Sequence, residues 1–113
     1  MSIPPELTAL VEQLNQELNQ IEQEITEGLN LVRLRLDRFP NNLILIQIFA
    51  SFNNYRLLVE NTRRRIDITV DSLRPNDPTN EEIQEAGEDL AEQLGRVLEA
   101  KIVVNSLKNR LEY

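Results

Sequence analysis

The sequence predicts an all-α protein in which three long antiparallel helices form a helical bundle or coiled-coil hairpin that is completed by oligomerisation. Apolar residues recur at alternating steps of three and four through three long segments, which is the spacing of helix faces that pack on one another. Prolines and asparagines separate these segments. The 113 residues include only three glycines, too few for the many turns of a sheet protein. We therefore expect one all-helical domain over residues 1–113.

The first helix is expected over residues 5–38. Pro4 and Pro5 suit a first helical turn, and Pro40 disfavours helix at the residue before it. Glu and Gln fill most of the other positions. The predicted apolar face, which also takes in Arg35, consists of Leu7, Val11, Leu14, Leu18, Ile21, Ile25, Gly28, Val32 and Phe39.

The second helix is expected over residues 42–73. Asn41 and Asn42 follow Pro40 and supply a turn and an N-cap. The predicted inner face keeps the same spacing and consists of Leu45, Ile48, Phe52, Tyr55, Val59, Thr62, Ile66, Thr69 and Leu73.

The third helix is expected over residues 80–111. The segment SLRPNDPTNEE precedes it, and Thr79 three residues before Glu82 forms a capping box. Each helix would be about 50 Å long at the usual rise per residue, and short connections make neighbours antiparallel. The predicted apolar face consists of Ile83, Leu90, Leu94, Val97, Val104 and Leu111.

A β-hairpin is the alternative for the first connection. The segments LNLVRLRLDRF and LILIQIF flank PNN, and their partly alternating leucines could form two strands. Both flanks continue helical spacing, however, and an isolated hairpin would need a sheet that no other segment offers. The helical interpretation is therefore preferred.

Composition limits the chemistry that this chain can perform. It contains no cysteine and no histidine, which removes thiolate metal sites and imidazole bases. The first residues, MSIPPELTALVEQL, lack the features of a signal peptide, and the longest apolar run is shorter than the roughly 20 residues of a membrane span. We expect a cytoplasmic protein that is not an enzyme, has no cofactor or metal, and does not contact a membrane.

Charge is strongly segregated along the chain. Residues 1–30 carry six acids and no base, residues 31–75 carry eight arginines against four acids, and residues 76–113 carry nine acids against four bases. Folding the chain at its two breaks would place the basic middle helix beside two acidic neighbours. Such pairing favours one helix arrangement and register.

The segment TRRRID is the clearest candidate for a ligand-binding site in the sequence, because clustered arginines can bind phosphates. A nucleic-acid-binding domain is usually basic, whereas the isoelectric point here is about 4.6. We therefore expect ion pairs within the chain and no nucleic-acid partner. The residues expected to pair are Arg63, Arg64, Arg65, Glu17, Glu22, Glu85, Glu88 and Asp89.

Carboxylates at ExxE spacing indicate an alternative, metal-dependent function. They occur in two of the predicted helices, at Glu22, Glu24, Glu27, Glu82, Glu85, Glu88, Asp89 and Glu92. The 14-residue segment EDLAEQLGRVLEAK resembles the second helix of all-α nucleotide pyrophosphatases of the MazG type, which hold magnesium between paired ExxE and ExxD helices. The resemblance implies a Mg-dependent pyrophosphohydrolase, but Arg96 stands where that family has an aspartate. Carboxylates at this spacing also occur on any solvated helix face.

The most unusual segment is Leu43–Phe52, in which eight of ten residues are apolar. A neighbouring helix of the same chain would cover only the inner seam of this segment. The remaining apolar side chains would need a further protein surface to shield them from water. The adjoining helix ends also carry a surplus, at Leu29, Leu31, Leu34, Leu98, Ile102 and Val103. The expected oligomer interface consists of Leu43, Ile44, Ile46, Phe49 and Phe52.

These observations predict a non-catalytic, self-associating helical protein that acts as a structural, scaffold or adaptor module. Its expected partner is a second copy in a homodimer or higher homo-oligomer, with an unidentified protein partner as a further possibility. The alternatives are the MazG-like hydrolase and then a nucleic-acid-associated protein.

Overall fold

The computed structural model describes residues 3–73 and 77–112. It contains three helices, α1 (Pro5–Arg38), α2 (Leu43–Leu73) and α3 (Asn80–Glu112), and no strand among these residues. The helix bounds agree with the predicted ones to within one residue, so the β-hairpin alternative is wrong. Part of the second predicted break, residues 74–76, lies outside the described residues.

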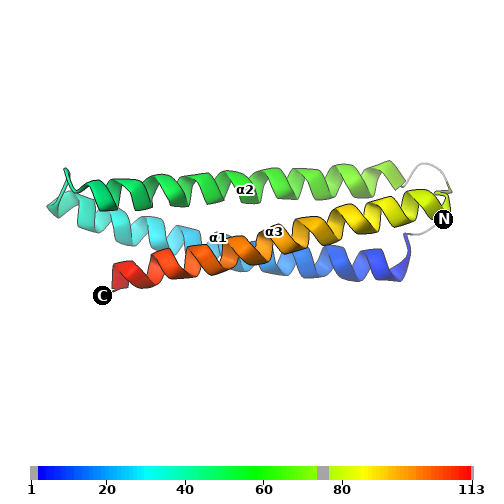
Figure 1. The fold of residues 1–113 in the computed structure, drawn as a ribbon, viewed down its shortest axis with the longest axis horizontal. Helices are drawn as coiled ribbons and strands as arrows, with labels where there is room; N and C mark the ends of the chain where they lie inside the picture. Colours follow the sequence, from blue (N-terminus) through cyan, green and yellow to red (C-terminus); the bar gives the residue numbers. More distant parts are fainter. Residues whose placement is uncertain (1–2, 74–76, 113) are drawn as a thin grey trace.

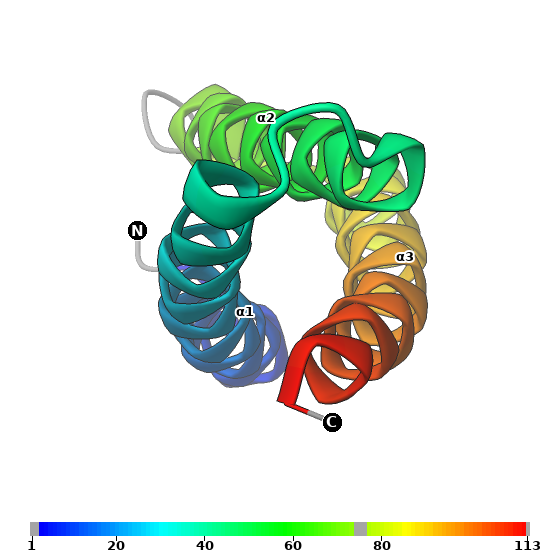
Figure 2. The same cartoon turned by 90° about the vertical axis from the view of Figure 1, so that its left-hand side faces the viewer.

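The helices run lengthwise beside one another and form a rod of 58 × 20 × 16 Å. The chain passes along α1 to the 39–42 turn, returns along α2, and passes in the first direction again along α3 (Figure 1). Seen along the rod, the helices occupy the corners of a triangle and wrap gradually around a common axis (Figure 2). We call the end with residues 39–42 the turn end and the opposite end the acidic end.

The helix starts follow the predicted capping. The side-chain oxygen of Asn42 accepts a hydrogen bond from the backbone N–H of Leu45 at 3.1 Å. The hydroxyl of Thr79 likewise accepts from the N–H of Glu82 at 3.1 Å. These bonds satisfy amide groups that have no carbonyl partner in the first turn, which fixes where α2 and α3 begin.

The core lies along the axis of the triangle and contains most of the predicted seam residues. Fully buried members from the three helices include Leu14, Phe52 and Val97. Phe39, predicted in the seam of the first helix, is instead 59% exposed because α1 ends at Arg38. Thr62 is buried as predicted, and its hydroxyl donates to the carbonyl of Leu58 at 2.7 Å.

Arg35 is the charged residue in the apolar seam of α1, and its guanidinium has a hydrogen-bond partner there. Its guanidinium donates a hydrogen bond to the backbone carbonyl of Leu111 near the end of α3. Carbonyls in the last turn of a helix lack partners within the helix and attract cations. The charged interruption in the first seam therefore links α1 to the end of α3.

Candidate interaction surface

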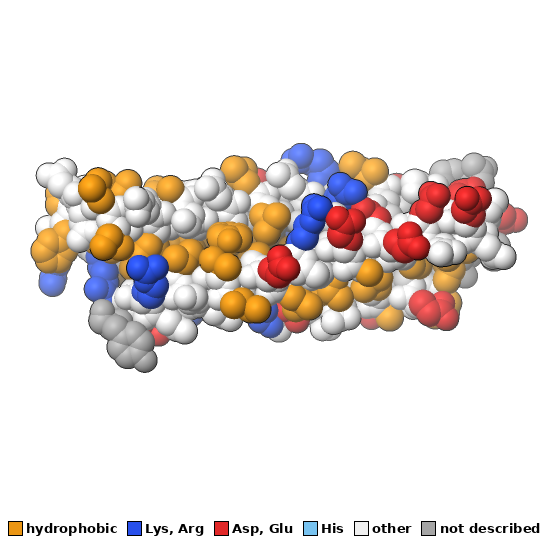
Figure 3. Space-filling model, in the orientation of Figure 1, with side chains coloured by type: hydrophobic (Ala, Val, Ile, Leu, Met, Phe, Trp, Pro, Cys, Tyr) orange, Lys and Arg blue, Asp and Glu red, His pale blue; other side chains and the backbone are white. Residues whose placement is uncertain are grey.

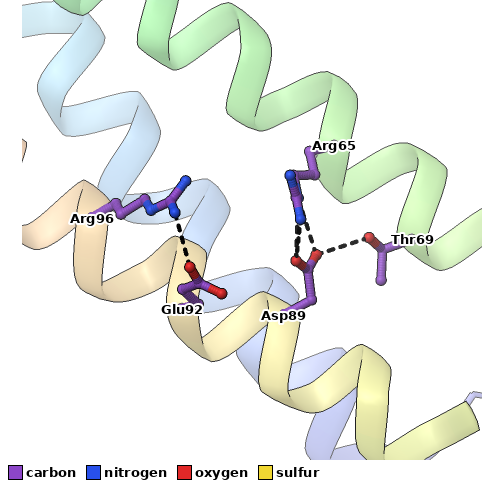
Figure 4. Close-up of polar contacts among 5 residues, drawn as sticks. All are labelled: Arg65, Thr69, Asp89, Glu92 and Arg96. Atoms are coloured by element: carbon purple, nitrogen blue, oxygen red, sulfur yellow. Dashed lines mark hydrogen bonds and ion pairs between the residues drawn. The ribbon is translucent and has the colours of Figure 1, made fainter.

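The shorter of the two predicted ion pairs that form joins α2 to α3 (Figure 4). The Nη2 atom of Arg65 lies 2.6 Å from Oδ1 of Asp89, and its Nε donates to the same carboxylate at 3.2 Å. The hydroxyl of Thr69 donates to Oδ2 of Asp89 at 3.2 Å. The charge pattern predicted the contact of Asp89 with the arginine cluster but not the hydrogen bond from Thr69.

These contacts shift the titration of both ionised groups. The hydrogen bond from Arg65 lowers the pKa of Asp89, and the Thr69 hydroxyl contributes in the same direction. The same carboxylate raises the pKa of Arg65. Both shifts favour the charged forms in the folded chain, so this contact supports folding at neutral pH.

We expect Asp89→Asn to destabilise the fold at pH 7, since it removes the charge that Arg65 contacts. The folded-state pKa of Asp89 lies below the unfolded one, so its contribution is complete above the unfolded value and is lost as pH falls through the folded value. The difference in free energy of unfolding between the original chain and the variant should therefore become smaller in acid. Urea unfolding at pH 7 and in acid measures it.

Glu92→Gln provides the control for this prediction. Glu92 pairs with Arg96 one turn along the same helix, at 2.8 Å, and both side chains are 58% exposed. Exposed pairs of this kind contribute little, so the control should unfold almost as the original chain does. Equal effects of the two substitutions at pH 7 would contradict a specific role for Asp89.

The other two arginines of the cluster behave differently from each other. Arg63 faces α1, where its Nη2 contacts Oδ1 of Asn19 at 2.9 Å and Oε1 of Glu22 at 3.6 Å. Arg64 is exposed and makes no hydrogen bond or ion pair with any described residue. Successive residues of a helix point about 100° apart, so three consecutive arginines cannot all face acidic neighbours.

The predicted acidic partners are also only partly placed beside arginines. Glu17 pairs within the chain, but with Lys101 of α3 at 3.0 Å. Glu88 accepts a hydrogen bond from Gln84 of its own helix, and Glu85 is exposed without an arginine contact among the described residues. The fold-back register was correct for Arg63 and Arg65, but it did not specify which side of each helix faces inward.

The acidic ExxE segments do not converge on one point. Within residues 3–73 and 77–112, no group of three acidic, histidine or cysteine side chains is placed to hold a metal ion. Individual members contact cations instead: Glu27 pairs with Lys108, which lowers the pKa of this glutamate. Glu27 therefore joins α1 to α3, whereas Glu22 and Asp89 contact arginines of α2.

The turn end carries the most exposed apolar side chains. Leu43 is 73% exposed, Ile44 59% and Ile46 42%. Leu34 on α1 and Ile102 on α3 are also exposed, whereas Leu29 is buried in the core. Figure 3 shows hydrophobic side chains gathered over the half of the rod nearer the turn and acidic side chains over the other half.

Two residues of the predicted interface differ from this pattern. Phe52 is fully buried within the chain, because its ring packs against the backbone at Gly28 of α1. Its placement on an oligomer surface was therefore wrong. Phe49 is half-buried against the core, and the guanidinium of Arg33 lies 5.7 Å from its ring centre, so Phe49 is less exposed than Leu43 and Ile44.

Two exposed apolar residues further along α2 were not predicted from the sequence, Leu57 at 55% and Ile68 at 63%. They follow Ile46 at intervals of 11 residues, which is close to three full turns of an α-helix. Figure 3 shows hydrophobic side chains at intervals along the upper edge of the rod, over α2. The 11-residue spacing was a signal that could have revealed this outer face.

No protein family, curated protein or solved structure matches this chain in the comparisons made. Within the described part of the chain, no helix combines the length and the apolar character that crossing a bilayer requires.

Proposed function

We propose that this chain is a non-catalytic, self-associating helical module that serves as a structural, scaffold or adaptor protein. The observation that carries the proposal is the group of large apolar side chains exposed at the turn end. Leu43, Ile44 and Phe39 are each more than half exposed there. Contiguous apolar patches larger than a few hundred Å² are rare on soluble monomers and usually mark interaction sites.

The free energy of association depends on how much of this surface a partner covers. Fully burying one leucine or isoleucine side chain contributes about 1.5–3 kcal/mol. Association also costs several kcal/mol or more in lost translational and rotational freedom. Several of the exposed side chains must therefore be buried together, and the turn end presents them on all three helices.

The distribution of polar groups supports interaction rather than chemistry. Several cations of the described residues contact carboxylates or carbonyls of the same chain, as Arg65 does with Asp89 and Lys101 with Glu17. Helices with a second apolar seam can extend coiled-coil packing to a further chain. The proposed partner is another copy of the protein, and a different protein that covers the same surface is the alternative tested below.

Light scattering at micromolar concentration tests the proposal directly. We expect a mass at least twice the chain mass of 13.1 kDa, because the turn end of one copy covers that of another. Ile46→Glu should reduce the mass to that of one chain while circular dichroism stays helical, since Ile46 is exposed on the folded chain and a buried glutamate would lack a partner.

Asn30→Glu is the matched control. It adds the same negative charge as Ile46→Glu, and Asn30 is exposed on α1 in the same half of the rod. It should leave the mass unchanged. A mass of one chain for the original protein would contradict self-association and leave a different protein as the partner for this surface.

A further inference from the structure

The α2 helix has a second apolar stripe on the side that faces away from the core. Leu43, Ile46, Ala50 and Leu57 are all exposed and follow one another at steps of three, four and seven. At 100° per residue these positions lie within about 60° of one another. The buried stripe of the same helix, which includes Phe52, lies on the opposite side. This half of α2 is therefore apolar on a second face as well, interrupted only by Asn53 and Asn54 between Ala50 and Leu57.

The outer stripe is also free of charge. Residues 41–55 contain no acidic or basic residue, and Arg38 and Arg56 are the nearest charges on either side. Burying an ionised group without a partner is strongly unfavourable, and two copies of this segment could meet without doing so. The rest of the chain is rich in charge, with 19 acids and 12 bases. This uncharged interval is therefore the part of the surface where two copies can pack together without burying or opposing charges.

Alanine occupies the middle of the stripe. Ala50 stands seven residues after Leu43 and seven before Leu57. A small residue at the crossing point allows two helix axes to approach to about 8 Å, the close end of the usual range. Larger side chains at equal distances on both sides would then pack around the crossing.

We propose that α2 pairs with α2 of a second copy in an antiparallel arrangement, with a two-fold axis next to Ala50. This inference rests on the proposed function, because it names the partner and the geometry for the α2 part of that surface. The equal spacing places Leu43 opposite the partner's Leu57, and Leu57 opposite the partner's Leu43. A closed two-fold dimer is the commonest symmetric assembly, and each copy contributes the same stripe.

Charge favours the antiparallel direction over the parallel one. The stripe from residue 43 to residue 57 covers about 21 Å of a rod 58 Å long. Antiparallel pairing overlaps the turn ends and leaves the acidic ends pointing away from each other. Parallel pairing would place the acidic ends side by side, with Glu81, Glu82 and Glu85 of both copies in proximity, and like charges would repel.

A longer antiparallel overlap fits less well. Bringing Ile68 opposite the partner's Leu43 would place Ile46 against the partner's Arg64–Arg65 segment. Arg65 already contacts Asp89 of its own chain, and covering it with apolar side chains would remove water from that charge. The short overlap centred at Ala50 avoids this.

Single-cysteine variants test the geometry, because the natural chain contains no cysteine. A disulfide needs Cα atoms about 4.4–6.8 Å apart, a distance that the two-fold axis allows at position 50. Under mild oxidation with oxidised glutathione, we expect Ala50→Cys to give mainly covalent dimers. Leu43→Cys and Leu57→Cys should each give few dimers alone but many when the two variants are mixed and oxidised together.

A charge at the crossing gives an independent measurement. Ala50→Arg should weaken dimerisation at least about 30-fold, the effect of losing an interface hot spot, with the helical signal retained. Ala91→Arg is the matched control, because Ala91 is an exposed alanine on α3; it should leave the association unchanged. Analytical ultracentrifugation of both variants against the original chain measures the two dissociation constants.

The outcomes separate this inference from the proposed function. Cross-linking of Leu43→Cys and Leu57→Cys each with itself would show parallel pairing and overturn the inference. A dimer that resists Ala50→Arg but dissociates with Ile102→Arg would also overturn it, since α3 would then form the interface; in both cases self-association would stand. A monomeric original chain would overturn both.

Discussion

Replacing Phe52 with alanine should lower the free energy of unfolding by about 3–5 kcal/mol, the usual cost of removing a large aromatic side chain from a core. The ring is fully buried between helices and lies against Gly28 of α1. Removing it leaves a cavity that the long, regular helices cannot easily close. Guanidinium unfolding followed by circular dichroism measures the loss.

Phe49→Ala is the control, because it removes the same side chain three residues earlier on the same helix. Phe49 is only partly buried, so its substitution should cost clearly less. If the two variants lost equal stability, or if Phe52→Ala lost association but not stability, the assignment of Phe52 to the core would be wrong. The original sequence-based placement of Phe52 on the oligomer surface would then be restored.

Gly28→Ala should destabilise the fold by about 1–3 kcal/mol, the usual effect of overpacking a core. A methyl group at this position would overlap Cζ of Phe52 and lie 2.8 Å from two further ring carbons. The ring must move, but it is enclosed on all sides. In an ordinary helical position, the same substitution is favourable because alanine restricts the unfolded chain and favours helix.

Gly95→Ala is the matched control for this second prediction. Nothing lies within 4 Å of the methyl group that it would add, and Gly95 is in the interior of α3. It should raise the free energy of unfolding by about 0.5–1 kcal/mol. Denaturant unfolding of both glycine variants should therefore show opposite signs.

A second substitution tests the cause of the Gly28 effect. Phe52→Leu alone should destabilise the fold, because leucine leaves space beside Gly28. In the double variant with Gly28→Ala, the smaller leucine should accommodate the new methyl group. The double variant should therefore lose less free energy of unfolding than the sum of the losses in the two single variants. Additive losses would contradict a direct clash between the two positions.

The helices could be predicted from the sequence because their limits depend on local chemistry. Pro40 prevents the continuation of α1, and Asn42 and Thr79 supply side-chain caps for the next two helices. The spacing of apolar residues identified the buried faces, including those at Thr62 and Gly28. Each of these signals acts within a few residues and does not depend on the packed structure.

The ion pairs could be predicted only in part. Counting back from the two breaks gives the register along the rod, and it correctly brought Arg65 near Asp89 and Arg63 near Glu22. The count does not use the buried stripe of each helix, which sets the direction of every side chain about the helix axis. Arg64 stands about 200° around α2 from the buried Thr62 and faces away from the acidic helices, and Glu17 faces Lys101.

The sequence by itself determined that this chain forms three helices, where each begins and ends, and which stripe of each is buried. Only the tertiary structure decided between the two placements that the sequence allowed for Phe52: its ring fills the space left by Gly28 in the core, while Leu57 is exposed on the outer side of α2. It also buried Gln93, whose amide nitrogen has no hydrogen-bond partner among the described residues. The spacing of apolar residues along the chain identifies each helix and its buried stripe. Whether a side chain outside that stripe is covered depends on how the three helices are arranged around their common axis.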